Sequence, residues 1–277
     1  MPKALSPGQI EAFERDGFLF GFDAISADAA KGLRTQLEAY ERTIGAEANT
    51  RLRVKAHLGF PWMVELARHP KVLDVIEDLI GPNIRLYLSS LWPKGARDGK
   101  FVSWHQDSAY YGLEPHEEVT AWVALTPSDR NNGCVRVIPG SHRGADFRHV
   151  ETYDASNLLS RGQTIEGIDE RIAVDMELRA GQFSVHHEKL VHGSAANDSD
   201  DRRIGIAFMY LPTHVRSTVG RRASILVRGE DRFGYWDDDP VPRFDLDPVA
   251  MAAMKRAQDA YRDPSVRSEA ERAGVAE

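Results

Sequence analysis

The stretch Asn83-Ile-Arg-Leu-Tyr-Leu-Ser-Ser-Leu-Trp92 marks the point at which the chain changes from a helical to a strand-like pattern. It is rich in β-favouring residues and follows Gly81-Pro82, a pair that is typical of a helix end. Similar short runs follow between Gly, Pro, Asn and Asp, at residues 101–104, 119–125, 134–138, 172–178, 183–187 and 204–210. This spacing predicts a β-sandwich or barrel, and the absence of alternating strand and helix patterns argues against a Rossmann or TIM fold.

Helical patterns come before this region. The run Ser-Pro-Gly-Gln at residues 6–9 predicts a capped helix start, and Gly17 is expected to end that helix. Ser26 is expected to cap a second helix that continues to about Thr43, and a third helix is expected from about Pro70 to Ile80.

The chain is expected to form one domain, because no stretch reads as a linker. A further helix is expected around residues 248–261, and the polar tail from Asp263 is expected to fray. The expected single domain covers residues 1–277, with a helical part at about 6–81, a β core at about 83–216, and a C-terminal helix and tail at about 247–277.

Composition excludes several classes of protein. The formal net charge of -7 argues against a general nucleic-acid-binding protein. No apolar run is long enough for a membrane helix, and the first residues do not follow a signal-peptide pattern. Cys134 is the single cysteine, which excludes an intrachain disulfide and fits a cytoplasmic protein. We expect a small-molecule substrate, and the oligomeric state is left open.

The segment Trp104-His105-Gln106-Asp107 places a histidine and an aspartate two positions apart, directly after an expected strand. In extended backbone, residues i and i+2 point to the same side, so one imidazole and one carboxylate can reach one ion. A distant histidine, His192, would complete a set of two histidines and one carboxylate, which leaves coordination positions open on Fe(II). These residues predict a mononuclear metal site.

The His-x-Asp/Glu pattern is weak by itself, because it also occurs at His116, His149 and His186. His116 and His149 are followed by Glu and lie in charged, loop-like surroundings, so we expect both at the surface. His186 and His187 end the strand that leads to His192. One of them could line the cavity, and the alternative is one imidazole in the core with the other pointing outward.

Arg203 opens the apolar run Ile204–Tyr210, which is typical of a buried strand. A buried guanidinium needs an anionic partner, and its planar, permanent charge suits the far carboxylate of a metal-bound oxoacid. Ser194 lies two residues after His192, so its hydroxyl could face the same carboxylate. The alternative is that Arg203 pairs with an acid of the preceding turn or exchanges roles with its neighbour: Asp198, Asp201 and Arg202.

Three stretches together resemble the phytanoyl-CoA dioxygenase family of Fe(II)/2-oxoglutarate oxygenases. The first is residues 104–107. The second is Asn-Gly-Cys-Val-Arg-Val-Ile-Pro-Gly-Ser-His at residues 132–142. The third begins with His-Gly-Ser at residues 192–194 and continues to Arg203. Asp-Gly-Phe at residues 16–18 is also similar to the family, so the resemblance spans most of residues 6–216.

The resemblance implies a mainly β fold with flanking helices around a double-stranded β-helix (jelly-roll, cupin-like) core. It implies that His105, Asp107 and His192 are the ligands of Fe(II). It also implies that Arg203 and Ser194 bind the carboxylate of the co-substrate 2-oxoglutarate, with O2 as oxidant.

Two further positions, Gln106 and Trp122, match family residues that contact the co-substrate. His142 matches a family residue that is not a ligand, and we interpret it as structural. The implied reaction hydroxylates an unactivated C–H bond and releases succinate and CO2. Halogenating relatives replace the carboxylate with a small residue, so the presence of Asp107 favours hydroxylation.

Arg51 to Leu58 alternates strictly between charged and apolar residues. If this segment is extended, one face carries four potential cations, which would attract an anionic substrate such as a carboxylic acid or an aminophosphonate: Arg51, Arg53, Lys55 and His57. The alternative is a solvated edge strand. Four residues near the metal motif could line the substrate pocket or serve structure alone: Lys94, Lys100, Tyr110 and Tyr111. Asp231–Asp239 could be a lid or a fixed staple.

A rival interpretation is a non-catalytic jelly-roll binding protein or a zinc-dependent cupin. The combination of Asp107 and Arg203 argues against both, because neither class needs an oxoacid anchor.

Overall fold

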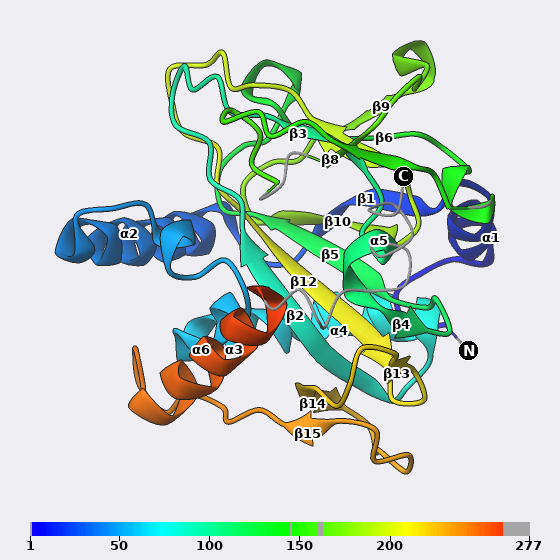
Figure 1. The fold of residues 1–277 in the computed structure, drawn as a ribbon, viewed down its shortest axis with the longest axis vertical. Helices are drawn as coiled ribbons and strands as arrows, with labels where there is room; N and C mark the ends of the chain where they lie inside the picture. Colours follow the sequence, from blue (N-terminus) through cyan, green and yellow to red (C-terminus); the bar gives the residue numbers. More distant parts are fainter. Residues whose placement is uncertain (1, 145, 160–162, 263–277) are drawn as a thin grey trace.

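Two sheets form the centre of the structure, a computed structural model that describes residues 2–144, 146–159 and 163–262 (Figure 1). The larger sheet has the strand order β1 (Phe18–Asp23), β10 (Gln182–His187), β5 (Val119–Ala124), β12 (Gly205–Pro212), β2 (Ile84–Leu91), β14 (Ala223–Arg228) and β15 (Asp237–Asp238). The smaller sheet has the order β3 (Val102–His105), β11 (His192–Ser194), β6 (Val135–Val137) and β9 (Val174–Met176). Two strand pairs complete the arrangement: β4 (Leu113–Glu114) with β13 (Arg216–Ser217), and β7 (His149–Glu151) with β8 (Gln163–Ile165). Together they form the expected jelly roll.

Each run that the sequence marked as a strand contains one, within a few residues of the expected bounds. Several elements were not expected, among them β1, β14 and the short helix α3 (Pro61–Ala67). β1 is short and carries Gly21, so its residues become a strand by pairing antiparallel with β10 at the sheet edge. β14 pairs in the same way with β2.

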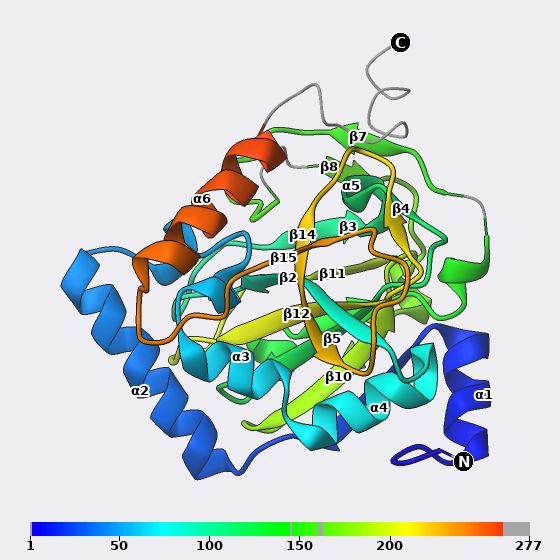
Figure 2. The same cartoon turned by 90° about the horizontal axis from the view of Figure 1, so that it is seen from below.

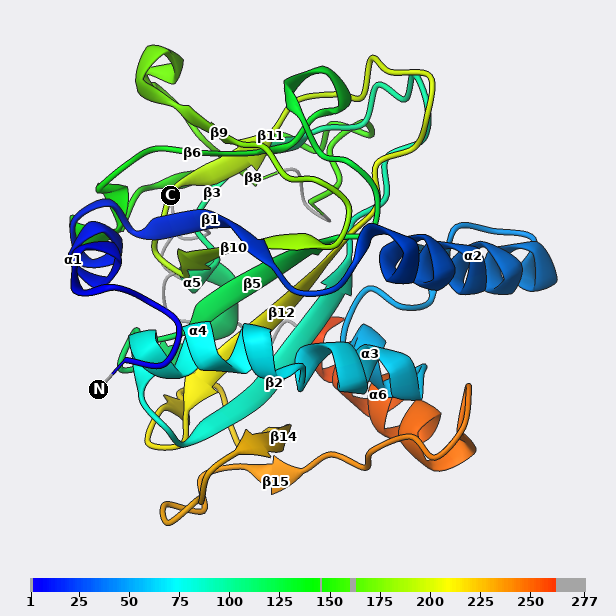
Figure 3. The same cartoon turned by 180° about the vertical axis from the view of Figure 1, so that it is seen from behind.

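Helices surround the larger sheet. α1 (Pro7–Asp16) begins with the expected capping box, and α2 (Ala27–Ile44) is capped by Ser26. α3 and α4 (Pro70–Ile80) lie against the outer face of the larger sheet (Figure 2). Figure 3 shows the same two helices from behind, with α2 to one side. The remaining helices are α5 (Ser108–Tyr111) and α6 (Pro248–Arg262), and α6 matches the expected C-terminal helix.

Alternation along the strands of the larger sheet separates two cores. Phe183 and Val185 of β10 pack beneath the helices. Side chains on the other face of the same sheet, such as Trp122 of β5 and Met209 of β12, pack between the two sheets. The space between the sheets therefore receives side chains from both, and the candidate site lies there.

The N-terminal helix is tied to the turn at residues 139–142. The Gly140 N–H donates to the Asp16 carbonyl at 2.8 Å, and His142 Nε2 lies 3.2 Å from the Glu14 carbonyl. A Cβ at Gly17, whose φ is 85°, would lie 2.5 Å from His142 Nδ1. His142 thus packs on the turn after α1, consistent with the structural role expected for it.

Residues 231–239 form a staple rather than a loose flap. Trp236 is buried, and its Nε1 donates to the Val215 carbonyl at 2.7 Å. Asp231 accepts from Arg85 Nε at 2.7 Å. The expected tail from Asp263 lies outside the described residues. Within the described residues, no helix combines the length and apolar character that crossing a membrane requires.

Candidate functional site

His105 and His192 face each other across neighbouring strands of the smaller sheet. The register of β3 and β11 places the two residues directly opposite, with ring centroids 4.1 Å apart. Asp107 follows two residues after His105, and its Oδ1 is 3.5 Å from His105 Nε2. The potential ligand atoms of these three buried residues lie within 4.8 Å of one another. The structure thus brings together the expected set, which we call the triad.

Backbone hydrogen bonds fix the tautomer of both histidines. His105 Nδ1 lies 2.9 Å from the Ser103 carbonyl, and His192 Nδ1 lies 2.9 Å from the Leu190 carbonyl. A carbonyl oxygen can only accept, so each Nδ1 carries a proton and each Nε2 is the ring nitrogen left for a metal ion. Burial also lowers the pKa of His192 well below its ordinary value. The Nε2 atoms of both rings are therefore oriented as metal ligands.

Asp107 supplies the negative charge of the triad. Burial disfavours its ionised form, but contact with His105 and the other imidazoles lowers the pKa of Asp107 well below its ordinary value. Two ring nitrogens and an ionised carboxylate therefore converge on one point. This donor set fits a divalent transition metal and leaves coordination positions open on the ion.

A pair of buried cations, Lys94 and Arg203, lies beside the triad; the two residues are 0% and 1% exposed. Burial, followed by repulsion from Arg203, lowers the pKa of Lys94 to about 6. Lys94 Nζ donates to Ser194 Oγ at 2.7 Å and to the Ala195 carbonyl. Arg203 Nε and Nη2 have no hydrogen-bond partner among the described residues. Buried donors of this kind fit the carboxylate of an acidic ligand.

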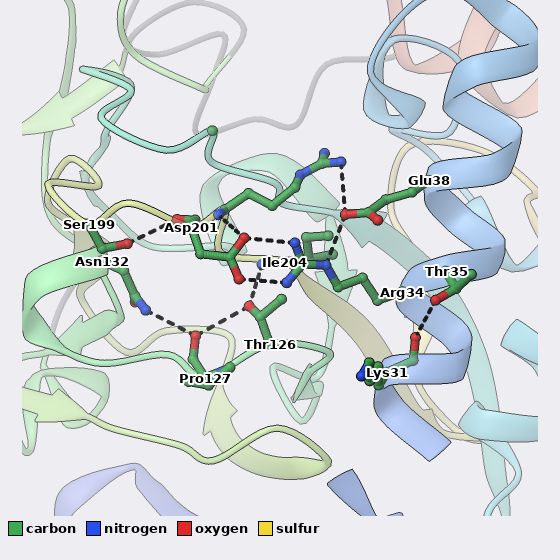
Figure 4. Close-up of polar contacts among 12 residues, drawn as sticks. Lys31, Arg34, Thr35, Glu38, Thr126, Pro127, Asn132, Ser199, Asp201 and Ile204 are labelled. Carbon is green, nitrogen blue, oxygen red and sulfur yellow. Dashed lines mark hydrogen bonds and ion pairs between the residues drawn. The ribbon is translucent and has the colours of Figure 1, made fainter. Parts of the chain in front are cut away.

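Asp201, one of the two acids of the preceding turn, is engaged elsewhere. Asp201 accepts two hydrogen bonds from Arg34, each 2.7 Å long (Figure 4). Arg202 Nη1 donates to Glu41 Oε2 at 2.6 Å. These pairs hold the turn against α2 and leave Arg203 to point into the cavity. Asp201 is therefore not the partner of Arg203.

Trp122 forms the wall behind Arg203. The guanidinium carbon of Arg203 lies 5.2 Å from the centroid of the Trp122 ring, and both residues line the cavity that contains the triad. A Cβ at Gly205 would lie 1.8 Å from Trp122 Cζ2. Glycine at position 205 therefore leaves room for the Trp122 ring across the neighbouring strand. The sequence predicted a co-substrate contact for Trp122.

The side chain of Gln106 is engaged by backbone groups, in contrast to its expected contact with the co-substrate. Gln106 Nε2 donates to the Lys189 carbonyl at 2.7 Å, and Gln106 Oε1 accepts from the Phe147 N–H at 2.9 Å. The Gln106 N–H donates to His149 Nε2 at 3.0 Å, so His149 is half-buried rather than a surface residue. Gln106 holds the loops around the triad together.

The basic face expected at residues 51–58 does not form, because this segment folds into turns and short 3₁₀ helices. Lys55 is buried and pairs with Asp239, and the buried His57 Nδ1 lies 2.8 Å from Ser89 Oγ. Arg51 is exposed. Of the four expected cations, Arg53 is the one that lines a cavity together with triad residues.

The other expected substrate residues lie in three different places. Lys94 lies beside Arg203 and Ser194 rather than in the cavity that Arg53 lines. Lys100 forms ion pairs with Glu47 and Asp98, at 3.3 Å and 3.2 Å. Tyr110 lines the same cavity as Arg53, as expected.

A larger cavity of about 350 Å³ adjoins the cavity that Arg53 and Tyr110 line. Arg222 lines it, and Arg222 Nη1 donates to the Tyr87 hydroxyl and, at 3.3 Å, to the Tyr111 carbonyl. In the described part of the chain, Arg222 forms no ion pair with a carboxylate. No sequence pattern singled out Arg222, because it reaches the site by tertiary packing. The two cavities share three lining residues: Val54, Leu88 and Tyr261.

His186 is a further residue of the triad cavity that the sequence left undecided. It is buried, and its Nε2 lies 3.9 Å from Asp107 Oδ2. The period-two pattern of β10 was the signal that could have placed it, because Phe183 and Val185 belong to the opposite face.

Comparison with known proteins agrees with this geometry. The chain is 32% identical over 179 residues to a probable alpha-ketoglutarate-dependent hypophosphite dioxygenase of Stutzerimonas stutzeri, covering 63% of this chain and 62% of that protein. It is 32% identical over 160 residues to a probable phytanoyl-CoA dioxygenase of Caenorhabditis elegans, covering 54% and 51%. The chain thus spans between half and two thirds of these relatives. Among solved structures, the non-heme monooxygenase ThoJ in its apo form is 31% identical, with a TM-score of 0.81 and coverage of 96% of this chain and 98% of that one.

A family model described as phytanoyl-CoA dioxygenase (PhyH) matches residues 13–205. This match includes all three triad residues, the buried cation pair and Trp122. The chain belongs to the phytanoyl-CoA dioxygenase family.

Proposed function

We propose that the chain is an Fe(II)- and 2-oxoglutarate-dependent oxygenase that hydroxylates a C–H bond of a small anionic metabolite and releases succinate and CO2. The observation that carries the proposal is the buried Lys94–Arg203 pair beside the triad. A metal site alone does not need two buried cations, whereas a diacid that chelates the metal needs both. Family membership supports the same reaction class.

Charge balance favours this assignment. A ferrous ion with the carboxylate of Asp107 keeps one positive charge, and 2-oxoglutarate brings two negative charges. Arg203 therefore makes the buried assembly neutral, which a low-dielectric cavity favours. Lys94 adds a further charge only to the extent that it takes up a proton beside that carboxylate, and its N–H groups can donate in either state. Iron, 2-oxoglutarate and O2 supply the oxidising chemistry, while the chain binds, orients and excludes water.

Two arginines along the substrate cavities favour an anion. The three aspartates that line the larger cavity, Asp237, Asp238 and Asp239, pair with Arg221, Arg85 and Lys55. Arg53 lines the cavity that meets His105 and Asp107, and Arg222 lines the larger cavity beyond it. The donors that Arg222 presents are not neutralised by a carboxylate among the described residues. A carboxylate, phosphonate or phosphate group held there would leave the rest of the substrate directed toward the triad. Hypophosphite, named for one relative, is also a small oxyanion.

Asp107 favours hydroxylation over halogenation, because its carboxylate takes the position that a halide would need. The rival functions are a non-catalytic binding protein and a zinc-dependent cupin. Neither accounts for the cations at Lys94 and Arg203.

Succinate formation tests the proposal. The purified chain is incubated with Fe(II), 2-oxoglutarate, ascorbate and O2, and a panel of small carboxylates, phosphonates and phosphate esters is screened for stimulation. We expect at least one anionic compound to stimulate succinate release and to gain one oxygen atom. Asp107→Ala, the metal-site control, should abolish both. No succinate with any compound, together with tight zinc binding, would favour the rivals.

Arg222→Gln tests the anionic part of the proposal, with Arg216→Gln as the matched control. Arg216 forms an exposed pair with Glu114. We expect the first change to raise the KM for the stimulating anion about tenfold, since a charge-assisted hydrogen bond contributes about 1.5–3 kcal/mol. The affinity for the co-substrate, 2-oxoglutarate, should stay unchanged, because its anchor is Arg203. Equal KM values for the anion in the two variants would show that Arg222 does not bind the substrate.

A further inference from the structure

Strand β10 delivers a third imidazole to the cavity of the triad. Phe183 and Val185 pack into the apolar core beneath the helices. His186 points to the opposite side, because successive residues of a strand alternate. It lines the same cavity as the triad and lies opposite Thr120 in the register of β5.

His186 is held close to one particular oxygen of Asp107. His186 Nε2 lies 3.9 Å from Asp107 Oδ2, whereas His105 Nε2 lies 3.5 Å from Oδ1. The two carboxylate oxygens therefore face different imidazoles. The rings of His186 and His192 are 4.6 Å apart between centroids, but the set of converging ligand atoms among the described residues does not include His186.

Both ring nitrogens of His186 lack a hydrogen-bond partner among the described residues, and the residue is 2% exposed. A buried polar group without a partner is destabilising, so this imidazole is expected to form a hydrogen bond once the site is complete. A histidine ring carries at least one N–H in either protonation state, so His186 has a donor to offer. Asp107 Oδ2 is an acceptor that a shift of about 1 Å would bring within hydrogen-bond distance.

We infer that His186 is a positioning residue of the metal centre, which donates from Nε2 to Asp107 Oδ2 and leaves Oδ1 as the ligand atom. A carboxylate that binds through one oxygen takes one coordination position, whereas a carboxylate that binds through both takes two. His186 therefore preserves the three open positions that two imidazoles and one carboxylate oxygen leave on a six-coordinate ion. The inference rests on the proposed metal site.

Metal affinity tests the inference without knowledge of the substrate. His186→Phe removes the N–H and keeps a ring, and His186→Gln keeps an N–H donor. With Co(II) as the probe on the metal-free chain, we expect the Phe variant to bind about 10- to 100-fold more weakly, the usual effect of removing a partner of a metal ligand. The Gln variant should recover most of that loss. Thermal unfolding of both metal-free variants verifies that they fold. If the folded Phe variant binds Co(II) as tightly as the wild type does, the inference is overturned.

Proton NMR of the Co(II)-loaded chain separates positioning from ligation. Each ligating histidine gives a strongly shifted, exchangeable N–H signal, so we expect two such signals, from His105 and His192, in both the wild type and His186→Phe. A third shifted signal that disappears in the variant would make His186 a ligand and overturn the positioning role. The proposed metal site has its own test. If Asp107→Ala binds Co(II) as tightly as the wild type, the proposed function fails, whatever the His186 variants show.

Discussion

Lys94 and Arg203 are joined by a pair of backbone hydrogen bonds, and the side chains of both are buried. The Lys94 N–H donates to the Arg203 carbonyl at 2.8 Å, and the Arg203 N–H donates to the Lys94 carbonyl at 2.9 Å. This bridge places two cations side by side where each repels the other. Such an arrangement is stable only when one cation gives up its proton or an anion arrives, and both outcomes can be measured.

Binding of the co-substrate 2-oxoglutarate should be accompanied by proton uptake at Lys94. The pKa of Lys94 is about 6 because of burial, so at pH 7.5 the amine is mostly neutral. A carboxylate beside it favours the charged form and raises its pKa. We therefore expect uptake of up to about one proton per ligand bound, and weaker binding as pH increases above 7. Calorimetry in two buffers of different ionisation enthalpy measures the uptake, and Lys94→Met should abolish it.

The same lysine should make the stability of the ligand-free chain depend on pH. Its pKa in the folded chain is about 6 and lies below the ordinary value of 10.5, so between these values the unfolded chain binds more protons than the folded one. The contribution of Lys94 to the free energy of unfolding therefore increases with pH across this window, by at most about 1.4 kcal/mol per pH unit. Urea unfolding at several pH values, compared with Lys94→Met, isolates this slope. Identical slopes in both proteins would contradict the expectation.

Arg203→Gln and Arg202→Gln should differ sharply although the residues are adjacent. Arg203 points its unpaired donors into the cavity, whereas Arg202 is paired with Glu41. Losing a charge-assisted hydrogen bond to a carboxylate costs about 1.5–3 kcal/mol, so Arg203→Gln should weaken 2-oxoglutarate binding by about 10- to 100-fold. Arg202→Gln should leave that affinity within about twofold and act on stability instead. Titration in the presence of metal under anaerobic conditions gives both values.

Gly205→Ala should be far more harmful than Gly32→Ala. An added Cβ at position 205 would overlap the Trp122 ring, whereas nothing lies within 4 Å of the corresponding position on Gly32. Overpacking in a core costs about 1–3 kcal/mol, while Gly to Ala inside a helix stabilises by about 0.5–1 kcal/mol. Denaturant unfolding should therefore show opposite signs for the two variants. Because Trp122 also packs on Arg203, the first variant should weaken 2-oxoglutarate binding as well.

Asp239→Asn tests the staple formed by residues 231–239. Asp239 pairs with Lys55, and the side chains are 3% and 6% exposed, so the change leaves a buried ammonium without its anion. Removing one partner of such a pair costs about 3–5 kcal/mol. Asp237→Asn is the matched control, since its partner Arg221 is exposed, and it should cost less than about 1 kcal/mol. Equal unfolding free energies would show that the staple does not stabilise the fold.

The sequence was sufficient for the elements whose signal is local. Ser6, with Gln9 three residues later, predicted the capping box of α1, because capping depends on residues within one turn. The strand pattern predicted β3, but β3 ends at His105, and Asp107 meets His105 from the start of α5 rather than through strand alternation. β1 was not predicted, because its residues show little strand-like alternation and form a strand by pairing with β10.

Roles that depend on distant partners were decided by the tertiary structure alone. The alternation of Arg51 to His57 predicted an extended basic face, but Lys55 and His57 are drawn into the core by Asp239 and Ser89. Lys94 was expected near the substrate, and its bridge to Arg203 places it beside that residue instead. The pattern of residue types thus determined which side chains could serve a metal and a diacid. Which buried charge meets which partner was decided by folding, because a charge leaves water only where the whole fold supplies its counterpart.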